Sequence, residues 1–500
     1  MGAPMAPSPN TGSSTKRTGL IIAIVGIVVA GALVGGIVAW RSGDDATIET
    51  SKGTKKPTDA QKKKRTEMKV EKKTTTTQAP GDPVLIENED CCEVNSLVKD
   101  AIVNINAFWD DEMPKVFDGQ AYDPISGGFW AASPDGPTPP CTDSPEQVRG
   151  NAFYCPAGDN IAWDAVELLP NIKEQFGDLA VGVVVAHEWG HSVQARVGLE
   201  APVVVLEQQA DCYAGSWVQH LQANPDGTFP TASGDIDGAL AGLISVADAP
   251  GTAASDPSAH GSAFDRANAF QDGLENGAEK CATYSEDTIT LVEFPFQTNE
   301  DADSNGNAPY DQIVTDITVP SLEDFWTRAF ADVYNKTWTP LAPIEPWDSS
   351  TGAPDCGSES VADYLIVYCP PDNAVIYDDE AMRNVYDNYG DFAVSALIGA
   401  RYGEVAMDIL SATTGDAAKD AITADCLAGA WTANVFNETA SGATNAVATL
   451  SPGDMDEAVR VLLDAGSAEA STGSDLSGFT RVAAYRNGVL NGIEACVPAR

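Results

Sequence analysis

The sequence predicts an α+β protein that is mostly helical and is preceded by a single transmembrane helix. Two observations predict this class. Several long segments have the pattern of helices, one of them ending before Gly198, and the strand-like segments are few and short. With 500 residues, the chain is long enough for two or three domains with sizeable cores.

The N-terminal segment predicts a membrane anchor. Residues 19–40 are uncharged and mostly apolar, and about 20 such residues span a bilayer as a helix. A cleavable signal peptide is the alternative, because Lys16 and Arg17 form a basic segment just before it. The same two residues place the short tail, residues 1–18, in the cytoplasm.

Residues 41–82 are rich in Lys and Thr and predict a disordered linker. Its lysines either contact anionic lipid or wall polymers or are simply solvated. The whole chain is acidic, with 73 Asp and Glu against 29 Lys and Arg and a net charge of −44. Such a surface repels nucleic acid, so we expect no nucleic-acid partner.

Apolar spacing and glycine stops place the elements of residues 83–290. They predict helices over 94–117 and 177–196, another from about residue 206 through 220, and a last one over 262–280. Residues 151–164 predict two short strands around a Pro/Gly/Asp turn, and the strand 161–164 is a candidate to pair with an extended substrate. The acidic Gly/Ala/Ser-rich stretch 225–258 is expected to connect the last two helices.

The chain repeats itself at an offset of 213 to 219 residues. GDLAVGVVVAHEWGH (177–191) aligns with GDFAVSALIGARYGE (390–404), and ADCYAGSW (210–217) aligns with ADCLAGAW (424–431). This indicates a tandem duplication. We therefore expect a first domain over 83–290, a linker over 291–309, and a second copy over 310–500. The second copy either recognises substrate or braces the first domain, or it persists only for packing.

The second copy lacks one particular set of side chains. Ala400, Arg401 and Glu404 stand where the first copy has His187, Glu188 and His191, and Ala421 and Asp475 replace Glu207 and His260. Glycines, tryptophans and cysteines around these positions are kept. Side chains needed only for packing should survive in both copies, so those lost together are candidates for one chemical task.

Those lost residues form a zinc-hydrolase pattern. In HExxH, positions i and i+4 share a helix face, so His187 and His191 can bind one metal while Glu188 stands beside the water. A catalytic zinc needs three protein ligands and an open position, and Glu207 is placed to be the third ligand. We expect one Zn²⁺ per chain, with Glu188 as the general base.

Three further residues keep alternative interpretations. Asp211 could accept a hydrogen bond from the far nitrogen of His187, but its survival as Asp425 favours a packing or capping role equally. His260 is a candidate catalytic donor to the oxyanion, or it caps a helix. His220, which becomes Asn434, is expected to be a partly exposed helix residue.

The chain resembles the putative neutral zinc metallopeptidases. The helix that carries Glu207, the expected third ligand, resembles the corresponding helix of thermolysin-like peptidases. The resemblance implies a zincin-like catalytic domain that hydrolyses peptide bonds in a peptide or protein substrate. The second copy departs from the simple family pattern, which leaves the role of residues 310–500 open. The matching segments are Tyr154 to Pro156, His187 to His191, Glu207 to Trp217, and His260 to Ser262 with Arg266.

The cysteines indicate an oxidising compartment. Eight of the ten correspond between the copies, and the simplest symmetric disulfide pairs are 141 with 155, 212 with 281, 356 with 369, and 426 with 496. Other connectivities are open at this stage, and Cys91 and Cys92 have no counterparts. These pairs place the catalytic domain outside the cytoplasm. The candidates are Cys141, Cys155, Cys212, Cys281, Cys356, Cys369, Cys426 and Cys496.

A second metal pattern is weaker. Asp301, Asp303 and Asn305 match the opening of an EF-hand-type calcium loop, but position twelve is Gln312 rather than a bidentate Glu. A polar linker fits the same residues. We therefore expect a membrane-anchored, extracytoplasmic zinc metallopeptidase; the alternative is a non-catalytic cell-envelope binding or scaffolding protein with a structural zinc or none.

Overall fold

The computed structural model describes residues 84–225, 227–253, 256, 259–289, 291–292, 296, 298–442, 446–470 and 476–499. The predicted tail, anchor and linker over residues 1–82 lie outside them, as does Asp475. Within the described residues, no helix combines the length and apolar character that a membrane crossing requires. These residues belong to one compact unit, in which helices outweigh short strands. The mostly helical α+β class is therefore confirmed.

Residues 84–289, here called the first half, contain a four-stranded sheet in the order β1-β2-β4-β3. β4 runs parallel to β2 and antiparallel to β3, so β3 is an edge strand. The two strands predicted within 151–164 are β3 and β4; β1, with two residues, is too short to show an alternation, and β2 was not predicted. The strands are β1 (Ile86–Glu87), β2 (Phe129–Ala132), β3 (Ala152–Cys155) and β4 (Asn160–Asp164).

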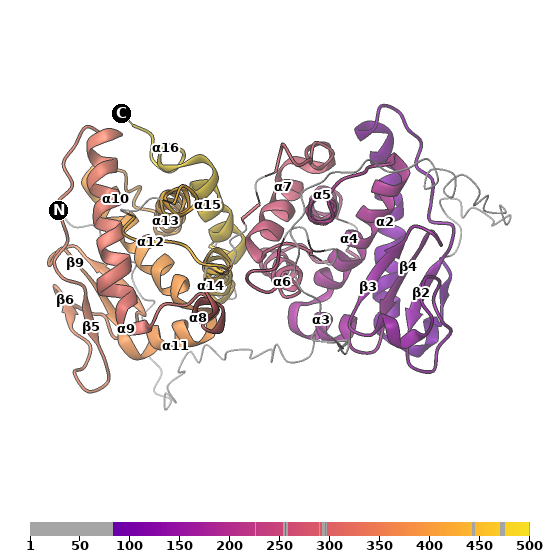
Figure 1. Ribbon diagram of the computed structural model, residues 1–500, viewed down its shortest axis with the longest axis horizontal. Helices are drawn as coiled ribbons and strands as arrows, with labels where there is room; N and C mark the ends of the chain where they lie inside the picture. Colours follow the sequence, from indigo (N-terminus) through magenta and orange to yellow (C-terminus); the bar gives the residue numbers. More distant parts are fainter. Residues whose placement is uncertain are drawn as a thin grey trace, which may run out of the picture. The chain divides into compact units, whose positions relative to one another are not determined.

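Helices cover this sheet, and α4, α5 and α7 lie beside one another in Figure 1. Four of them match the predicted helices within a few residues, but α3 and α6 were not predicted. α6 lies in the stretch expected to be a connection, where its many glycines hid the apolar spacing. The helices are α2 (Val94–Val116), α3 (Leu168–Phe176), α4 (Asp178–Val197), α5 (Val203–Ala223), α6 (Ser233–Ile244) and α7 (Ala263–Cys281), with η1 (Glu89–Cys91) and η2 (Pro145–Val148).

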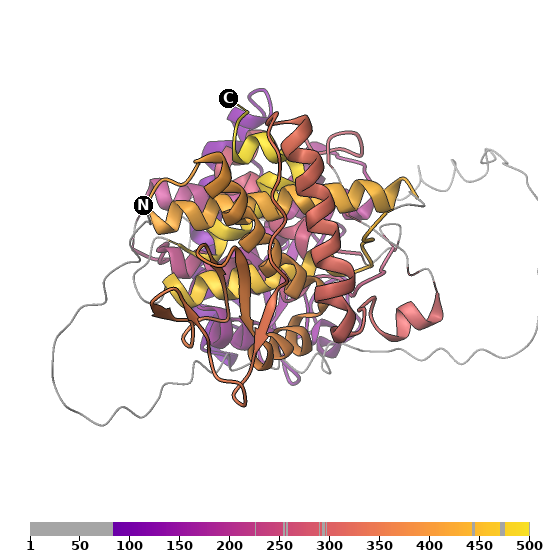
Figure 2. The same cartoon turned by 90° about the vertical axis from the view of Figure 1, so that its left-hand side faces the viewer.

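Residues 310–499, the second half, show the same succession of long helices after a small sheet in the order β5-β9-β8. Figure 2 faces this half, with α10 and the short strands in front of the orange and yellow helices. Its strands are β5 (Glu345–Trp347), β6 (Asp355–Cys356), β7 (Glu359–Ser360), β8 (Ile366–Cys369) and β9 (Ala374–Asp378). Its helices are α9 (Tyr310–Gln312), η3 (Ile313–Thr318), α10 (Val319–Asp332), α11 (Asp379–Tyr389), α12 (Asp391–Leu410), α13 (Ala417–Ala440), α14 (Asp454–Ala470), α15 (Gly478–Asn491) and α16 (Ile493–Cys496).

Two glycines bring α5 and α7 into backbone contact. A Cβ on Gly215 would lie under 3.0 Å from the carbonyl oxygen of Phe270, and one on Gly273 would clash with the carbonyl oxygen of Cys212. Gly429 and Gly488 make the same approach between α13 and α15. Any side chain at these four positions would push the helices apart.

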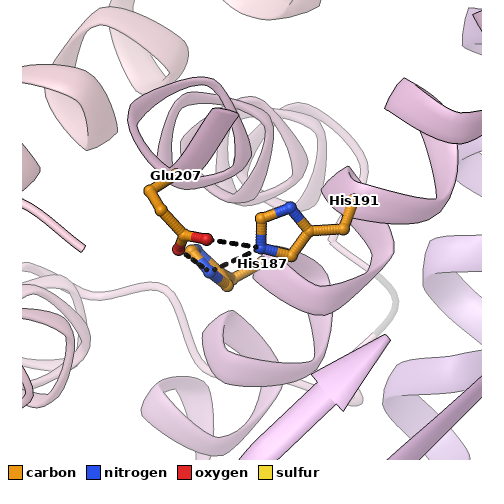
Figure 3. A group of neighbouring side chains, drawn as sticks. All are labelled: His187, His191 and Glu207. Carbon is orange, nitrogen blue, oxygen red and sulfur yellow. Dashed lines mark hydrogen bonds and ion pairs between the residues drawn. The ribbon is translucent and has the colours of Figure 1, made fainter. Parts of the chain in front are cut away.

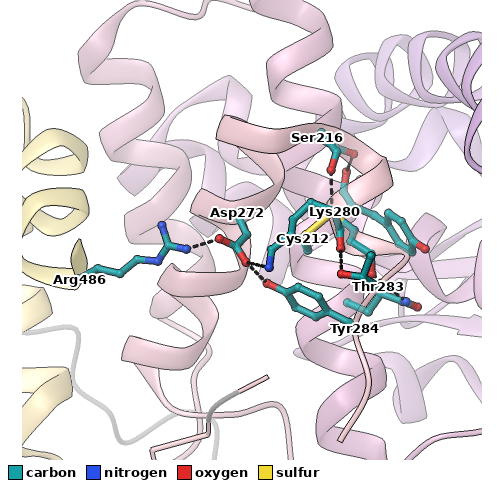
Figure 4. Close-up of a disulfide and its surroundings, with 11 residues drawn as sticks. Cys212, Ser216, Asp272, Lys280, Thr283, Tyr284 and Arg486 are labelled. Carbon is teal, nitrogen blue, oxygen red and sulfur yellow. Dashed lines mark hydrogen bonds and ion pairs between the residues drawn. A yellow bond between two sulfur atoms is a disulfide. The ribbon is translucent and has the colours of Figure 1, made fainter. Parts of the chain in front are cut away.

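A disulfide joins the same two helices. Cys212 of α5 pairs with Cys281 at the end of α7 (Figure 4), and Cys426 pairs with Cys496 in the second half. The structure also pairs Cys141 with Cys155, Cys356 with Cys369, and Cys91 with its neighbour Cys92. The first four are the pairs that the internal symmetry favoured.

We predict that Cys212→Ala with Cys281→Ala strongly destabilises the fold. The bridge spans 69 residues, and a loop of that length contributes about 4 kcal/mol in the chain-entropy description. Urea unfolding should therefore show a loss of about 2–5 kcal/mol in the free energy of unfolding. Cys426→Ala with Cys496→Ala, whose bridge spans 70 residues, is the matched variant and should lose a similar amount. Free thiols at these positions in the oxidised wild type would contradict the assignment.

Candidate metal centre and its supporting contacts

Helix α4 carries two of the predicted ligands on one face. It begins after Gly177 and ends at Gly198, both with positive φ, so its bounds agree with the predicted helix within a residue. His187 and His191 are one turn apart, and their rings lie edge to face with centroids 4.9 Å apart. Their Nε2 atoms are 3.2 Å from each other. Two ring nitrogens at this separation indicate that both point at one common position.

Helix α5 supplies the third side chain. Figure 3 shows the carboxylate of Glu207 facing both imidazoles. One oxygen lies 3.2 Å from Nε2 of His187, and the other lies 3.4 Å from Nε2 of His191. His187, His191 and Glu207 thus form a group that could hold a metal ion. α5 begins at Val203, three residues earlier than predicted, because Pro202 sets the chain direction just before its first turn.

The geometry of this group fits zinc. One ligand atom from each of the three side chains lies within 4.8 Å of the others, which is close enough for all three to share one zinc ion. Oε2 of Glu207 is buried and lies 3.2 Å from Nε2 of His187 without the geometry of a hydrogen bond, so the imidazole contact does not fully satisfy this oxygen. Burial raises the pKa of Glu207, but the two imidazoles outweigh burial and hold it well below its usual range. The carboxylate is therefore charged, as a metal ligand must be.

The group is partly exposed. The side chains of His191 and Glu207 are 20% and 13% exposed, whereas His187 is 7% exposed. Structural zinc sites are closed by four protein ligands, and catalytic sites take three and keep a position for water or substrate. Among the described residues, this group consists of three side chains.

Asp211 supports His187 from behind. Its Oδ1 lies 2.6 Å from Nδ1 of His187, and Arg266 of α7 donates to both of its oxygens at 2.8 Å. Burial raises the pKa of Asp211, but Arg266 and His187 outweigh it and lower that pKa. A carboxylate at Nδ1 favours the tautomer whose Nε2 lone pair faces the metal position.

The second half resolves the two interpretations of Asp211. Asp425 makes the same bidentate pair with Arg481, at 2.8 and 3.0 Å, although no histidine occupies position 400. The carboxylate is thus retained in both halves because it pairs with a buried arginine between two helices. Only in the first half does it also hold an imidazole.

His191 has its own support, which the sequence interpretation missed. Its Nδ1 lies 3.0 Å from Oε1 of Gln194, and Gln194 Nε2 donates to the carbonyl oxygen of Leu206 at 2.7 Å. Gln194 therefore connects α4 to the turn that precedes Glu207. The available signal was the comparison of the two copies, since Met407 stands where Gln194 would align.

Glu188 lies one position round the helix and is 8% exposed. Its Oε2 accepts a hydrogen bond of 2.9 Å from the backbone N–H of Tyr154 in β3. Burial raises the pKa of Glu188, while His187 and His191 lower it; the net direction is upward. A carboxyl whose pKa lies above the ordinary value is better suited to take and return a proton near neutral pH.

The structure corrects the strand proposed to pair with substrate. β4, which contains residues 161–164, is bonded on both sides by β2 and β3, so it has no free edge. β3 is the edge strand, and its N–H at Tyr154 already reaches Glu188. Arg196 of α4 holds this strand in place by pairing with Asp159, which also accepts from the Tyr154 hydroxyl.

The other two histidine candidates lie outside the metal group. His260 is on a loop before α7; its Nδ1 lies 3.7 Å from Asp248, and its side chain is 46% exposed. Its carbonyl oxygen accepts from Gln208, the neighbour of Glu207. The oxyanion role of His260 stays a prediction. His220 is a partly exposed residue of α5, as expected, and its ring lies against Phe108 with centroids 5.2 Å apart.

The calcium alternative is not supported. Asp301 and Asp303 belong to a short helix, α8 (Asn299–Asp303), rather than to a loop that turns its oxygens inward. Among the described residues, the groups of side chains close enough to share a metal include neither aspartate. The physical reason is the helix itself, since residues two apart on a helix point in different directions.

Comparison with known proteins gives the same chemical class. Residues 138–284 match the family model described as putative neutral zinc metallopeptidase. That segment contains every member of the metal group and its supporting aspartate.

The similar proteins are themselves uncharacterized. The chain is 31% identical to the uncharacterized protein YpfJ of Escherichia coli (strain K12) over 158 residues, which cover 26% of this chain and 53% of the relative. It is also 31% identical to the uncharacterized protein Rv2575 of Mycobacterium tuberculosis (strain ATCC 25618 / H37Rv) over 169 residues, covering 28% and 57%. The chain thus spans about half the length of the curated relatives it matches. No solved structure matched this chain.

We predict that Asp211→Asn weakens zinc binding by about 10- to 100-fold, because the Nδ1 hydrogen bond fixes the orientation of His187. Competition with a colorimetric chelator measures this affinity. Asp425→Asn is the control, since it disturbs the equivalent pair with Arg481 and should reduce stability without changing zinc affinity. Equal zinc affinity in both variants would remove the supporting role of Asp211.

Proposed function

We propose that this protein is a zinc-dependent peptidase that acts outside the cytoplasm and is anchored to the membrane through residues 19–40. The observation that carries the proposal is the grouping of His187, His191 and Glu207, with Glu188 near enough for the charges of both histidines to act on its carboxyl group. The family match over residues 138–284 supports the reaction class. The five disulfides support an oxidising compartment, and thus a catalytic domain beyond the membrane.

When bound, zinc would lower the pKa of a coordinated water to about 7 and polarise the scissile carbonyl. The residues of the chain hold the ion and transfer the proton. His187, His191 and Glu207 hold the ion, and Asp211 fixes the ring of His187. Glu188 accepts a proton from the attacking water and passes it to the leaving nitrogen, while the N–H of Tyr154 keeps its carboxylate oriented.

The edge strand β3 is the proposed platform for an extended peptide. Its outer side is not used by another strand of the sheet, and its Tyr154 N–H contacts the catalytic carboxylate. A peptide pairing there would bring its backbone alongside Glu188. This replaces the role first considered for residues 161–164.

We further propose that the two halves arose by tandem duplication and that the second has lost catalysis. It repeats the long helices, the glycine contacts, the disulfide and the buried Asp–Arg pair. Ala400, Arg401, Glu404 and Ala421 stand at the catalytic positions, so it cannot form the same metal group.

The base is tested by Glu188→Gln. We expect one zinc per chain in both wild type and variant, because the ligands are untouched, with turnover of casein or a peptide library reduced at least about 100-fold. Glu404→Gln, on the corresponding helix of the second half, should retain full turnover. A Glu188→Gln protein as active as the wild type would refute the assigned role, and a wild type without zinc would refute the proposal as a whole.

Metal removal separates the enzyme from the scaffolding alternative. We expect chelation to abolish turnover while leaving the far-ultraviolet circular dichroism spectrum unchanged, because the core and the disulfides hold the fold without the ion. Added zinc should restore activity. A structural zinc predicts the opposite, namely that chelation unfolds the domain.

A further inference from the structure

Each half places the carboxylate of one aspartate at the N-terminus of the last long helix of the other half. Asp237 of α6, in the first half, accepts from the backbone N–H groups of Gly478 and Phe479 at 2.9 and 2.7 Å. Asp456 of α14, in the second half, accepts from the N–H of Phe264 at 2.9 Å. The exchange is therefore reciprocal.

These carboxylates satisfy helix ends that would otherwise be unpaired. The first N–H groups of a helix have no partner within the helix, and negative charge is favourable there. Asp237 and Asp456 are only 1% and 7% exposed, so water does not replace them readily. Each helix also has its own cap, Ser262 for α7 and Ser477 for α15. The aspartate from the opposite half therefore binds a helix that is already capped, and it fixes the position of that helix.

Further contacts hold α7 against the second half. Gln271 donates to the carbonyl oxygen of Phe479 at 3.3 Å. Arg486 of α15 pairs with Asp272 of α7 and donates to Asn268; Figure 4 shows Arg486 reaching Asp272. α7 is thus bound at its first turn and along its length by residues outside the metal-binding half.

From the first turn of α7, a short series of contacts leads to the metal group. Arg266 follows Phe264 by two residues and is 2% exposed. It donates to both oxygens of Asp211, and Asp211 holds Nδ1 of His187. A shift of the α7 N-terminus would move Arg266, then the carboxylate, and then the imidazole.

We infer that the second half is a positioning element for the metal centre, and that Asp456 is the positioning residue through which it acts. This inference rests on the proposed function, because it assigns the contact to the same site. The partner is the chain's own second half, so the retained copy has a task although it has lost the metal ligands.

The reciprocal contact supplies a matched control. Asp237 makes the same kind of contact to α15, whose Arg481 pairs with Asp425, but that series ends at Ala400. Loss of either aspartate removes one buried carboxylate and its bonds to a helix N-terminus in the opposite half. Loss of Asp456 acts directly on the first turn of the helix that carries Arg266, whereas loss of Asp237 reaches that helix only indirectly, through Phe479 and Gln271.

The experiment compares Asp456→Ala and Asp237→Ala in the full-length chain, with zinc affinity measured by chelator competition and thermal stability measured in the metal-free state. We expect both variants to lose similar stability, and Asp456→Ala alone to weaken zinc binding by about tenfold, the lower end of the range for disturbed supporting contacts. The visible absorption spectrum of the Co²⁺-loaded protein should also change in Asp456→Ala only. Asp456→Asn keeps one acceptor oxygen, so it should fold and lose less zinc affinity.

The outcomes separate the two proposals. If the wild type binds no zinc, the proposed function fails, and this inference fails with it. If the wild type binds zinc but both alanine variants keep its affinity, or lose it equally, the positioning role is wrong while the peptidase proposal stands. If Asp456→Ala does not fold, Asp456→Asn decides: an unchanged affinity and Co²⁺ spectrum in that variant overturn the inference.

Discussion

The metal group depends on one buried ion pair, Asp211 with Arg266, between α5 and α7. Both side chains are almost completely inaccessible, at 0% and 2% exposed, so each charge needs the other. Arg266 uses two donors on the carboxylate, which fixes the distance and the orientation of the two helices together. Loss of one partner would leave an uncompensated charge in the core, which typically costs about 3–5 kcal/mol. The pair therefore fixes how α5 and α7 lie against each other.

Helix packing and covalent linkage satisfy the same constraint. The glycines at 215 and 273 allow the two backbones to touch, and the disulfide from Cys212 begins one residue after Asp211. These contacts fix the position of α5. Glu207 lies on this helix one turn before Asp211, and it faces His187 and His191, which share one face of α4. The metal group thus forms between three helices whose relative positions are fixed by contacts that are not themselves ligands. The second half keeps those contacts without the ligands, which shows that they serve the fold first.

The sequence predicted the components of this site better than their connections. HExxH and the spacing to Glu207 predicted the three side chains that the structure groups, because helical periodicity alone puts i and i+4 on one face. Comparison of the copies suggested the cysteine pairs. Arg266 and the Tyr154 N–H were not assigned, since their contacts join residues 55 and 34 positions apart. Gln194 was missed although it lies only three residues from His191 on the same helix. The missed helix α6 and the free edge of β3 have a similar cause: composition masked the first, and strand order is not written in local alternation.

The two halves also distinguish chemistry from architecture within a single molecule. Five residues absent from the second half meet at or beside the metal group, namely His187, Glu188, His191, Glu207 and Gln194, whereas His220 and His260 lie outside it. Residues present in both halves, such as the Asp–Arg pairs and the reciprocal carboxylates Asp237 and Asp456, join helices or join the halves. Asp456 bonds the first turn of α7, the helix whose Arg266 holds the aspartate that contacts His187, so this contact between the halves ends on the helix that supports the metal group.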